Sequence, residues 1–128
     1  DAAFDRDVHR FGKLAGKEIT PTKDGIDMIR SHLKNLDSSP VNDFMISQIE
    51  EALKNGSSLR GPYSSFYMHE LSESMFMRNG FSYNSAHNMA LQKYSVSPYS
   101  VYSPQAIQTY PQYFNKNWLN FWGIGGKN

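Results

Sequence analysis

The sequence predicts a mainly α fold: a small single-domain helical bundle with a central antiparallel helix pair and an irregular Pro/Tyr-rich C-terminal segment wrapped around it. Apolar residues recur at helical spacing in several windows between residues 20 and 94, and Ser, Thr, Pro or Gly residues typical of helix ends bound these windows. Strand patterns are weak everywhere, residues 99–102 being the best candidate. The chain has 128 residues, which is enough for one domain with a core and too few for two.

The first half of the chain predicts a lead-in followed by two amphipathic helices. Residues 1–19 are expected to be flexible, because Gly12 and Gly16 interrupt the apolar spacing there. Helices are expected at about residues 20–36 and 40–56, since each window starts with a Ser/Thr-Pro pair and the second ends in glycine.

A helical hairpin is expected next. Residues 64–78 and 83–94 carry the two helices, with Asn79-Gly80 ending the first and Ser82 capping the second. Because the connection is so short, the two helices must lie antiparallel and side by side.

Beyond residue 94 the pattern becomes irregular, with prolines breaking up a tract rich in Ser and Tyr. A last amphipathic helix is expected at residues 115–122, with Trp118 and Trp122 in the core. Residues 125–128 are expected to form a disordered tail, so that the domain proper spans 20–124.

Composition excludes several classes of protein. The absence of Cys excludes disulfides and thiolate zinc sites. No apolar run approaches the roughly 20 residues of a membrane span, so a soluble protein without stable membrane association is expected. The net charge of +1 is too low for a general nucleic-acid binder, and any RNA contact would depend on few cations, on stacking or on a partner. The missing initial Met predicts a fragment of a longer protein.

The placement of acidic residues points to a functional site. After Glu51 the chain has only two carboxylates, Glu70 and Glu73, both within one helical turn of His69. His69 and Glu73 are four residues apart and within side-chain reach on a helix, and the hairpin should bring His87 close to Glu73. On the same helix, we expect an arc of four other residues to face the core: Tyr67, Met68, Leu71 and Met75.

This cluster has three interpretations. In the first, His69 and His87 are acid and base, Glu73 orients them, and Glu70 and Tyr67 support the site or contact substrate, which suits metal-free RNA cleavage. In the second, His69, Glu73 and His87 bind zinc and Glu70 is the base, although the second histidine of the usual H-E-x-x-H motif is missing. In the third, the cluster is a structural polar network that holds two helices together.

Substrate contacts are expected from tyrosines that stack on unpaired bases and from the cations nearest the hairpin. The candidates are Tyr83, Tyr99, Tyr102, Arg60, Arg78 and Lys93. The other two histidines, His9 and His32, have no carboxylate or histidine partner at useful spacing and are interpreted as surface or packing residues.

Four strings of the sequence resemble those of a known group of domains: Phe66–Glu70, Ala86-His87 with Ala90-Leu91, Val101–Pro104, and Phe114–Trp122. They are similar to the C-terminal toxin domains of bacterial polymorphic toxins, the CdiA-type contact-dependent growth inhibition and Rhs-type effectors, over approximately residues 17–124.

This resemblance implies a domain that is delivered as part of a larger secreted or cell-surface protein, acts in the cytoplasm of the target cell and is neutralised by a cognate immunity protein. Many such domains are RNases, often acting on tRNA, while others are DNases and some form pores. The combined prediction is a metal-independent RNase toxin that needs no cofactor, with a host translation factor as a conceivable presenter of tRNA. The alternatives are a metal-dependent DNase or peptidase toxin and a non-enzymatic interaction module.

Overall fold

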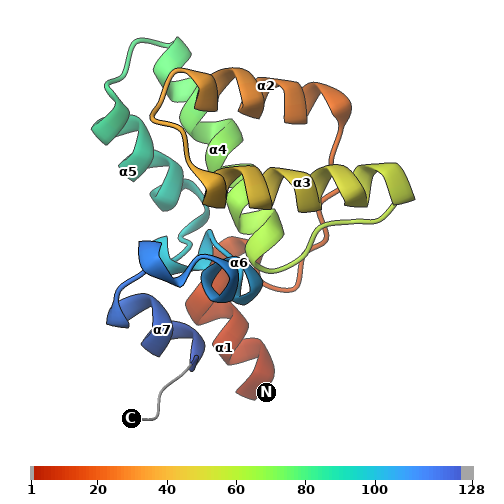
Figure 1. Cartoon of the computed structure of the whole chain (residues 1–128), viewed down its shortest axis with the longest axis vertical. Coiled ribbons are helices and arrows are strands. Elements are labelled where there is room, and N and C mark those ends of the chain that lie inside the picture. The colour runs from red at the N-terminus through yellow and green to blue at the C-terminus, as the bar shows by residue number, and fades with distance from the viewer. Residues whose placement is uncertain (1, 125–128) are drawn as a thin grey trace.

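The computed structural model describes residues 2–124, which are mainly helical as predicted (Figure 1). The described part contains no strand and consists of the α-helices α1 Ala2–Phe11, α2 Lys23–Lys34, α3 Pro40–Asn55, α4 Pro62–Arg78, α5 Tyr83–Tyr94, α6 Pro104–Thr109 and α7 Lys116–Trp122. Short 3₁₀ helices occupy Gly12–Leu14, Pro98–Ser100 and Pro111–Tyr113. None of the described helices is both long and apolar enough to cross a membrane.

Local capping explains where most helices begin and end. The side chains of Ser39 and Ser82 each accept a hydrogen bond from the backbone N–H three residues on, so the predicted starts of α3 and α5 are confirmed. Gly56 ends α3 in the left-handed conformation, with φ of 69°. The start of α2 differs from the prediction, because Thr22 and not Thr20 caps this helix.

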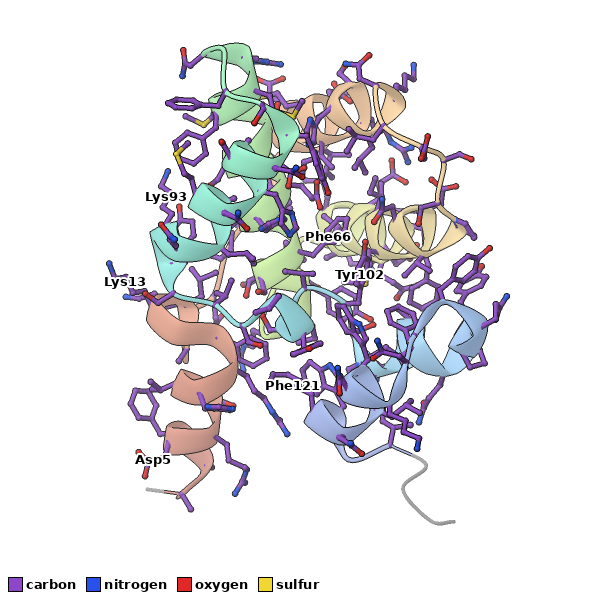
Figure 2. The ribbon with its side chains drawn as sticks, turned by 90° about the vertical axis from the view of Figure 1, so that its left-hand side faces the viewer. Asp5, Lys13, Phe66, Lys93, Tyr102 and Phe121 are labelled. Carbon is purple, nitrogen blue, oxygen red and sulfur yellow. The ribbon has the colours of Figure 1, made fainter. Side chains whose placement is uncertain are left out.

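α4 is the central helix of the molecule (Figure 1). It packs against α2 and α3 on one side and forms the predicted antiparallel hairpin with α5 on the other. The C-terminal elements lie along its N-terminal half, where the ring centroids of Phe66 and Tyr102 are 5.9 Å apart (Figure 2). The main core lies between α2, α3, α4 and α6 and is formed by Ile26, Ile29, Val41, Met45, Ile46, Ile49, Leu59, Phe66, Tyr67 and Ala106.

The burial of α4 corrects the prediction of its core-facing arc. Tyr67 is buried as expected, but Met75 is 47% exposed. His69, Glu70 and Glu73, which lie outside that arc, are buried as well. A helix enclosed by neighbours on several sides has no single apolar face, so its periodicity does not indicate which side is covered.

The N-terminal segment is also more ordered than expected. Helix α1 and the following 3₁₀ turn occupy residues 2–14, and Phe11 and Leu14 are buried against Val96. The Arg10 guanidinium lies 4.8 Å from the ring centroid of Trp122 on α7, a cation–π contact that joins the two ends of the fold. The predicted flexible lead-in is therefore corrected over residues 2–14, whereas the predicted tail at residues 125–128 lies outside the described residues.

A close approach at Gly25 gives a first prediction. A Cβ at this position would overlap the Tyr67 hydroxyl, which accepts a hydrogen bond from the Thr22 backbone N–H at 3.1 Å. We expect Gly25→Ala to lower the free energy of unfolding by about 1–3 kcal/mol, because α2 must move away from α4. The free energy of unfolding is measured in urea for Gly25→Ala, for Tyr67→Phe and for the double variant. The double variant should recover part of the loss, because the Tyr67 ring carbon still lies 2.9 Å from the added Cβ. A stabilising Gly25→Ala, as helix propensity alone predicts, would contradict the overlap.

Candidate active site

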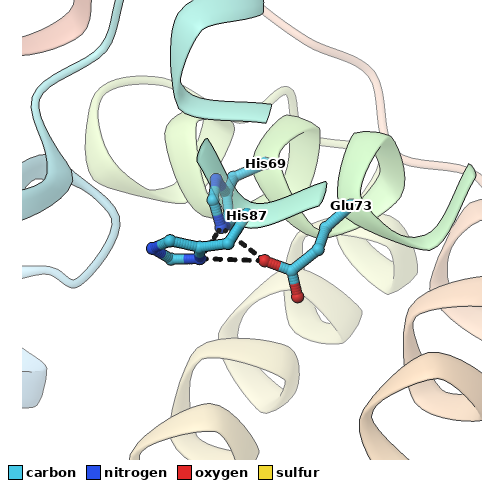
Figure 3. Close-up of side chains that lie close together, drawn as sticks. All are labelled: His69, Glu73 and His87. Carbon is cyan, nitrogen blue, oxygen red and sulfur yellow. Dashed lines mark hydrogen bonds and ion pairs between the residues drawn. The ribbon is translucent and has the colours of Figure 1, made fainter. Parts of the chain in front are cut away.

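Glu73 is the buried centre of a cluster of three imidazoles, and Figure 3 shows it with two of them, His69 and His87. Its Oε1 lies 2.7 Å from His32 Nε2. Its Oε2 lies 2.9 Å from His87 Nδ1 and 3.1 Å from His69 Nε2. The two imidazole nitrogens on this side are themselves 3.2 Å apart. Both carboxylate oxygens of Glu73 are thus engaged, one on each side.

Three helices supply these side chains. His69 and Glu73 are one turn apart on α4, which puts them on the same flank. The hairpin brings His87 of α5 opposite Glu73, as the sequence predicted. His32 comes from the last turn of α2, which packs against α4. The cluster therefore links α2, α4 and α5.

The pKa values of the two carboxyl groups of the cluster, Glu70 and Glu73, are shifted in opposite directions. Burial alone raises the pKa of the Glu73 carboxyl, but hydrogen bonds from His32, His69 and His87 outweigh this and hold its pKa well below the usual range. Burial, and secondarily the charge of Glu73, raises the pKa of the Glu70 carboxyl well above its usual value. Glu73 is therefore held as an anion, while burial makes the Glu70 carboxyl hold its proton more tightly than a free carboxyl does.

His87 is the imidazole of the cluster that reaches the surface. Its side chain is 36% exposed, compared with 2% for His69. Because Glu73 is ionised and can only accept, Nδ1 of His87 must carry the proton that joins them. In neutral His87 the lone pair is then on Nε2, which points away from Glu73 (Figure 3). The Tyr83 ring stacks on His87 with centroids 5.6 Å apart and fixes the orientation of the imidazole.

A pocket of about 170 Å³ opens at this cluster. Its volume is smaller than the roughly 300 Å³ at which pockets for drug-sized molecules begin, so it suits one flat ring or a few groups of a larger molecule. Among residues 2–124, neither Lys nor Arg lines it, and the lining residues are Leu33, Leu36, Asn42, His69, Glu70, Glu73, Tyr83, His87, Pro98, Val101, Tyr102 and Trp118. The wall is therefore apolar and carboxyl-bearing, and within the described part of the chain its positive charge can come only from imidazole.

Two of the predicted substrate-contact residues lie at the pocket. Tyr83 and Tyr102 line it, and the Tyr102 hydroxyl donates a hydrogen bond to Asn42 Oδ1 at 2.6 Å. Burial, together with the nearby Glu70 carboxyl, raises the pKa of Tyr102, so its hydroxyl stays protonated. Tyr83 can therefore donate a hydrogen bond or pack against a substrate ring, whereas Tyr102, whose only O–H is donated to Asn42, offers its ring and its hydroxyl oxygen as an acceptor.

The other predicted site residues lie elsewhere. Tyr67 is bonded to the start of α2 and does not line the pocket, so the structure gives it a packing contact instead of a place at the cluster. Tyr99 packs edge-on against Trp118, with ring centroids 5.0 Å apart, and is also absent from the pocket wall.

The predicted cations are also separate from the pocket. Arg60 pairs with Glu18 at 2.6 Å, Lys93 lies 5.5 Å from the Tyr94 ring centroid, and Arg78 lines a different hollow beside His32. A phosphate held in the pocket would meet none of these three side chains there.

The sequence assigned two residues of the cluster or pocket to other roles. His32 was interpreted as a surface or packing residue, but it makes the shortest contact with Glu73. Trp118 was assigned to the core, but it is half-buried and lines the pocket. The sequence carries a weak signal for His32 only: it lies in the last turn of an amphipathic helix, next to the apolar stripe.

The cluster also offers ligand atoms to a metal ion. His69 Nε2, His87 Nδ1 and Glu73 Oε2 lie 2.9–3.2 Å from one another. Tetrahedral zinc with ligand bonds of about 2.0–2.1 Å separates its ligands by about 3.3 Å, so a slight expansion of this triangle would fit such an ion. His32, bonded to the other oxygen of Glu73, would be the outer partner that orients a ligating carboxylate. The second group with suitable atoms is His32, Glu70 and Glu73.

The buried Glu70 carboxyl gives a prediction of pH dependence. Its pKa is raised in the folded state, so its contribution to stability is lost as pH rises from the unfolded value of about 4.3 through the folded value. Gln at this position is neutral at every pH. Urea unfolding at pH 4 and pH 8 should therefore show Glu70→Gln gaining stability relative to the wild type as pH rises. A stability difference that is the same at both pH values would mean that Glu70 titrates normally.

Comparisons with known proteins assign the chain to no family. No protein-family model, no curated protein and no solved structure matches the chain.

Proposed function

We propose that this chain is a bacterial toxin domain that cleaves RNA without a metal ion, with His87 as the general base and Glu73 as the group that orients it. The observation that carries the proposal is the 2.9 Å bond between Glu73 and His87 Nδ1, which leaves the other ring nitrogen of a half-exposed histidine facing away from the carboxylate. A carboxylate on the far nitrogen fixes the tautomer and strengthens the base.

The reaction needs one proton acceptor and one proton donor. His87 Nε2 takes the proton of a ribose 2′-hydroxyl, the 2′-oxygen forms a bond to phosphorus, and the bond from phosphorus to the 5′-oxygen breaks. Glu70, which lines the same pocket and whose carboxyl pKa is raised by burial, gives its proton to the leaving oxygen. The products are a 2′,3′-cyclic phosphate and a 5′-hydroxyl, and solvent returns both groups to their starting states.

The role of His69 changes in this proposal. The sequence suggested that His69 and His87 share the proton transfers, but His69 is buried and its Nε2 faces Glu73 and His87. We therefore assign His69 to holding Glu73 in place. The donor role passes to Glu70.

The wall of the pocket supports an unpaired base as the group that is bound. Tyr83, Tyr102 and Trp118 offer ring faces and edges, and stacking contributes about 1–3 kcal/mol per base. Because none of the described Lys and Arg residues lines the pocket, we assign phosphate binding to cations outside it or to a protein that presents the RNA. A translation factor that carries tRNA fits that requirement, and the toxin resemblance adds a cognate immunity protein as the second partner.

The proposal is tested by producing the domain from an inducible promoter in cells without an immunity protein. Total RNA and DNA are separated on gels before and after induction, with Glu73→Gln as the inactive variant. We expect discrete RNA fragments and intact DNA with the wild type, and intact RNA with Glu73→Gln. Degraded DNA, or growth arrest with both nucleic acids intact, would contradict the proposal.

A metal-dependent hydrolase is the second candidate, because three ligand atoms converge within 3.2 Å. A bound zinc ion would supply an activated water and the positive charge that the pocket wall lacks. His69, Glu73 and His87 would hold the ion, and Glu70 would be the nearby base. Activity of the purified domain that is lost in EDTA and returns with added zinc would favour this candidate. Activity that persists in EDTA favours the first.

A further inference from the structure

His32 approaches Glu73 from the side opposite to the pocket. It is 6% exposed, and its Nε2 lies 2.7 Å from Oε1 of Glu73, while both hairpin histidines contact Oε2. Without His32, Oε1 of Glu73 would lose its hydrogen-bond donor in a buried site, where an unpaired polar atom destabilises the fold. The carboxylate could then rotate and weaken its bond to His87.

His32 also lines a second hollow, which has a volume of about 270 Å³. Its lining residues are Ser31, His32, Asn35, Ser74, Met77 and Arg78, none of which lines the pocket at His87. The imidazole of His32 thus separates a surface hollow from the Glu73 carboxylate. If this ring were removed, the hollow would extend towards Oε1 and leave a space with the shape of an imidazole.

We propose that His32 is a positioning residue for the reaction and that its place can be taken by a small N–H donor entering through the hollow lined by Ser31, Asn35, Ser74, Met77 and Arg78. This inference rests on the proposed function for its effect on rate. The binding of a donor behind Glu73 rests only on the geometry, and it holds whether or not a metal ion takes part.

The test compares His32→Ala with His9→Ala, a histidine that is exposed and stacked on Phe121 outside the cluster. Cleavage of RNA is measured at pH about 8.5 with no addition, with imidazole, and with 1-methylimidazole. Imidazole carries an N–H that can donate to Oε1, whereas neutral 1-methylimidazole has the same ring without that donor. We expect His32→Ala to lose at least tenfold in kcat with little change in KM, and to regain activity with imidazole only. His9→Ala should match the wild type.

Thermal unfolding with the same additives provides a readout that does not need activity. The midpoint of His32→Ala should rise with imidazole, and neither 1-methylimidazole with this variant nor imidazole with His9→Ala should reproduce the rise. If the wild type cleaves no RNA but this selective rise occurs, the proposed function fails and the donor site stands. Wild-type activity in His32→Ala, or equal effects of the two additives, would overturn the inference. If His32→Ala folds only when imidazole is present, as judged by circular dichroism, that result supports it.

Discussion

Glu73→Ala is expected to lower the free energy of unfolding by about 3–5 kcal/mol at neutral pH, because it removes the acceptor shared by three imidazoles in a buried site. The pKa of Glu73 is depressed in the folded state, so its stabilising effect is present above the unfolded value of about 4.3 and is lost as pH falls towards the folded value. Urea unfolding at pH 7 and pH 3 measures both effects. The gap between wild type and variant should narrow at pH 3.

The matched control for this change is Glu50→Ala. Glu50 also accepts from a cation, Arg30, but both side chains are exposed, and such pairs contribute about 0–1 kcal/mol. We expect Glu50→Ala to remain within that range at both pH values. Equal losses for the two variants would mean that Glu73 is no more than an ordinary member of an ion pair.

His87→Ala is expected to reduce kcat/KM for RNA by about 10²–10⁴-fold, the range for loss of a general base. Its effect on folding should be small, since the side chain is 36% exposed and Glu73 keeps His32 and His69 as donors. Rates are measured with a fluorescent oligoribonucleotide, and the unfolding midpoint is measured on the same samples.

Tyr83→Phe is the control for a change next to His87 that leaves the imidazole itself in place. Phenylalanine keeps the ring that stacks on the imidazole, so this variant should retain the stability of the wild type. A His87→Ala variant that cleaves RNA at the wild-type rate would exclude His87 as the base. A variant that unfolds at room temperature would show that His87 is structural.

The hairpin and the Glu73–His87 contact could be predicted because both depend on local signals. Asn79-Gly80 and Ser82 mark adjacent helix ends, and the short connection fixes the register of α4 against α5. In that register position 73 faces position 87 without further information from the fold.

The contacts that were missed depend on long-range packing. His32 meets Glu73 across 41 positions of sequence, and only the packing of α2 on α4 brings them together. Tyr67 was placed at the site although the helical spacing also put it in the core-facing arc, and it is buried and bonded to the start of α2. Trp118 lines the pocket, but an apolar residue at helical spacing looks the same in the sequence whether it fills the core or forms a pocket wall.

The end groups of the RNA fragments test the central claim most directly. The purified wild-type domain is incubated with RNA in excess EDTA, and the new ends are identified enzymatically and by mass spectrometry. If His87 deprotonates the 2′-hydroxyl without a metal ion, the fragments carry 2′,3′-cyclic phosphate and 5′-hydroxyl ends, and Glu73→Gln yields none. Fragments with 3′-hydroxyl ends that form only without EDTA would contradict the account, and so would cyclic-phosphate ends from Glu73→Gln at the wild-type rate.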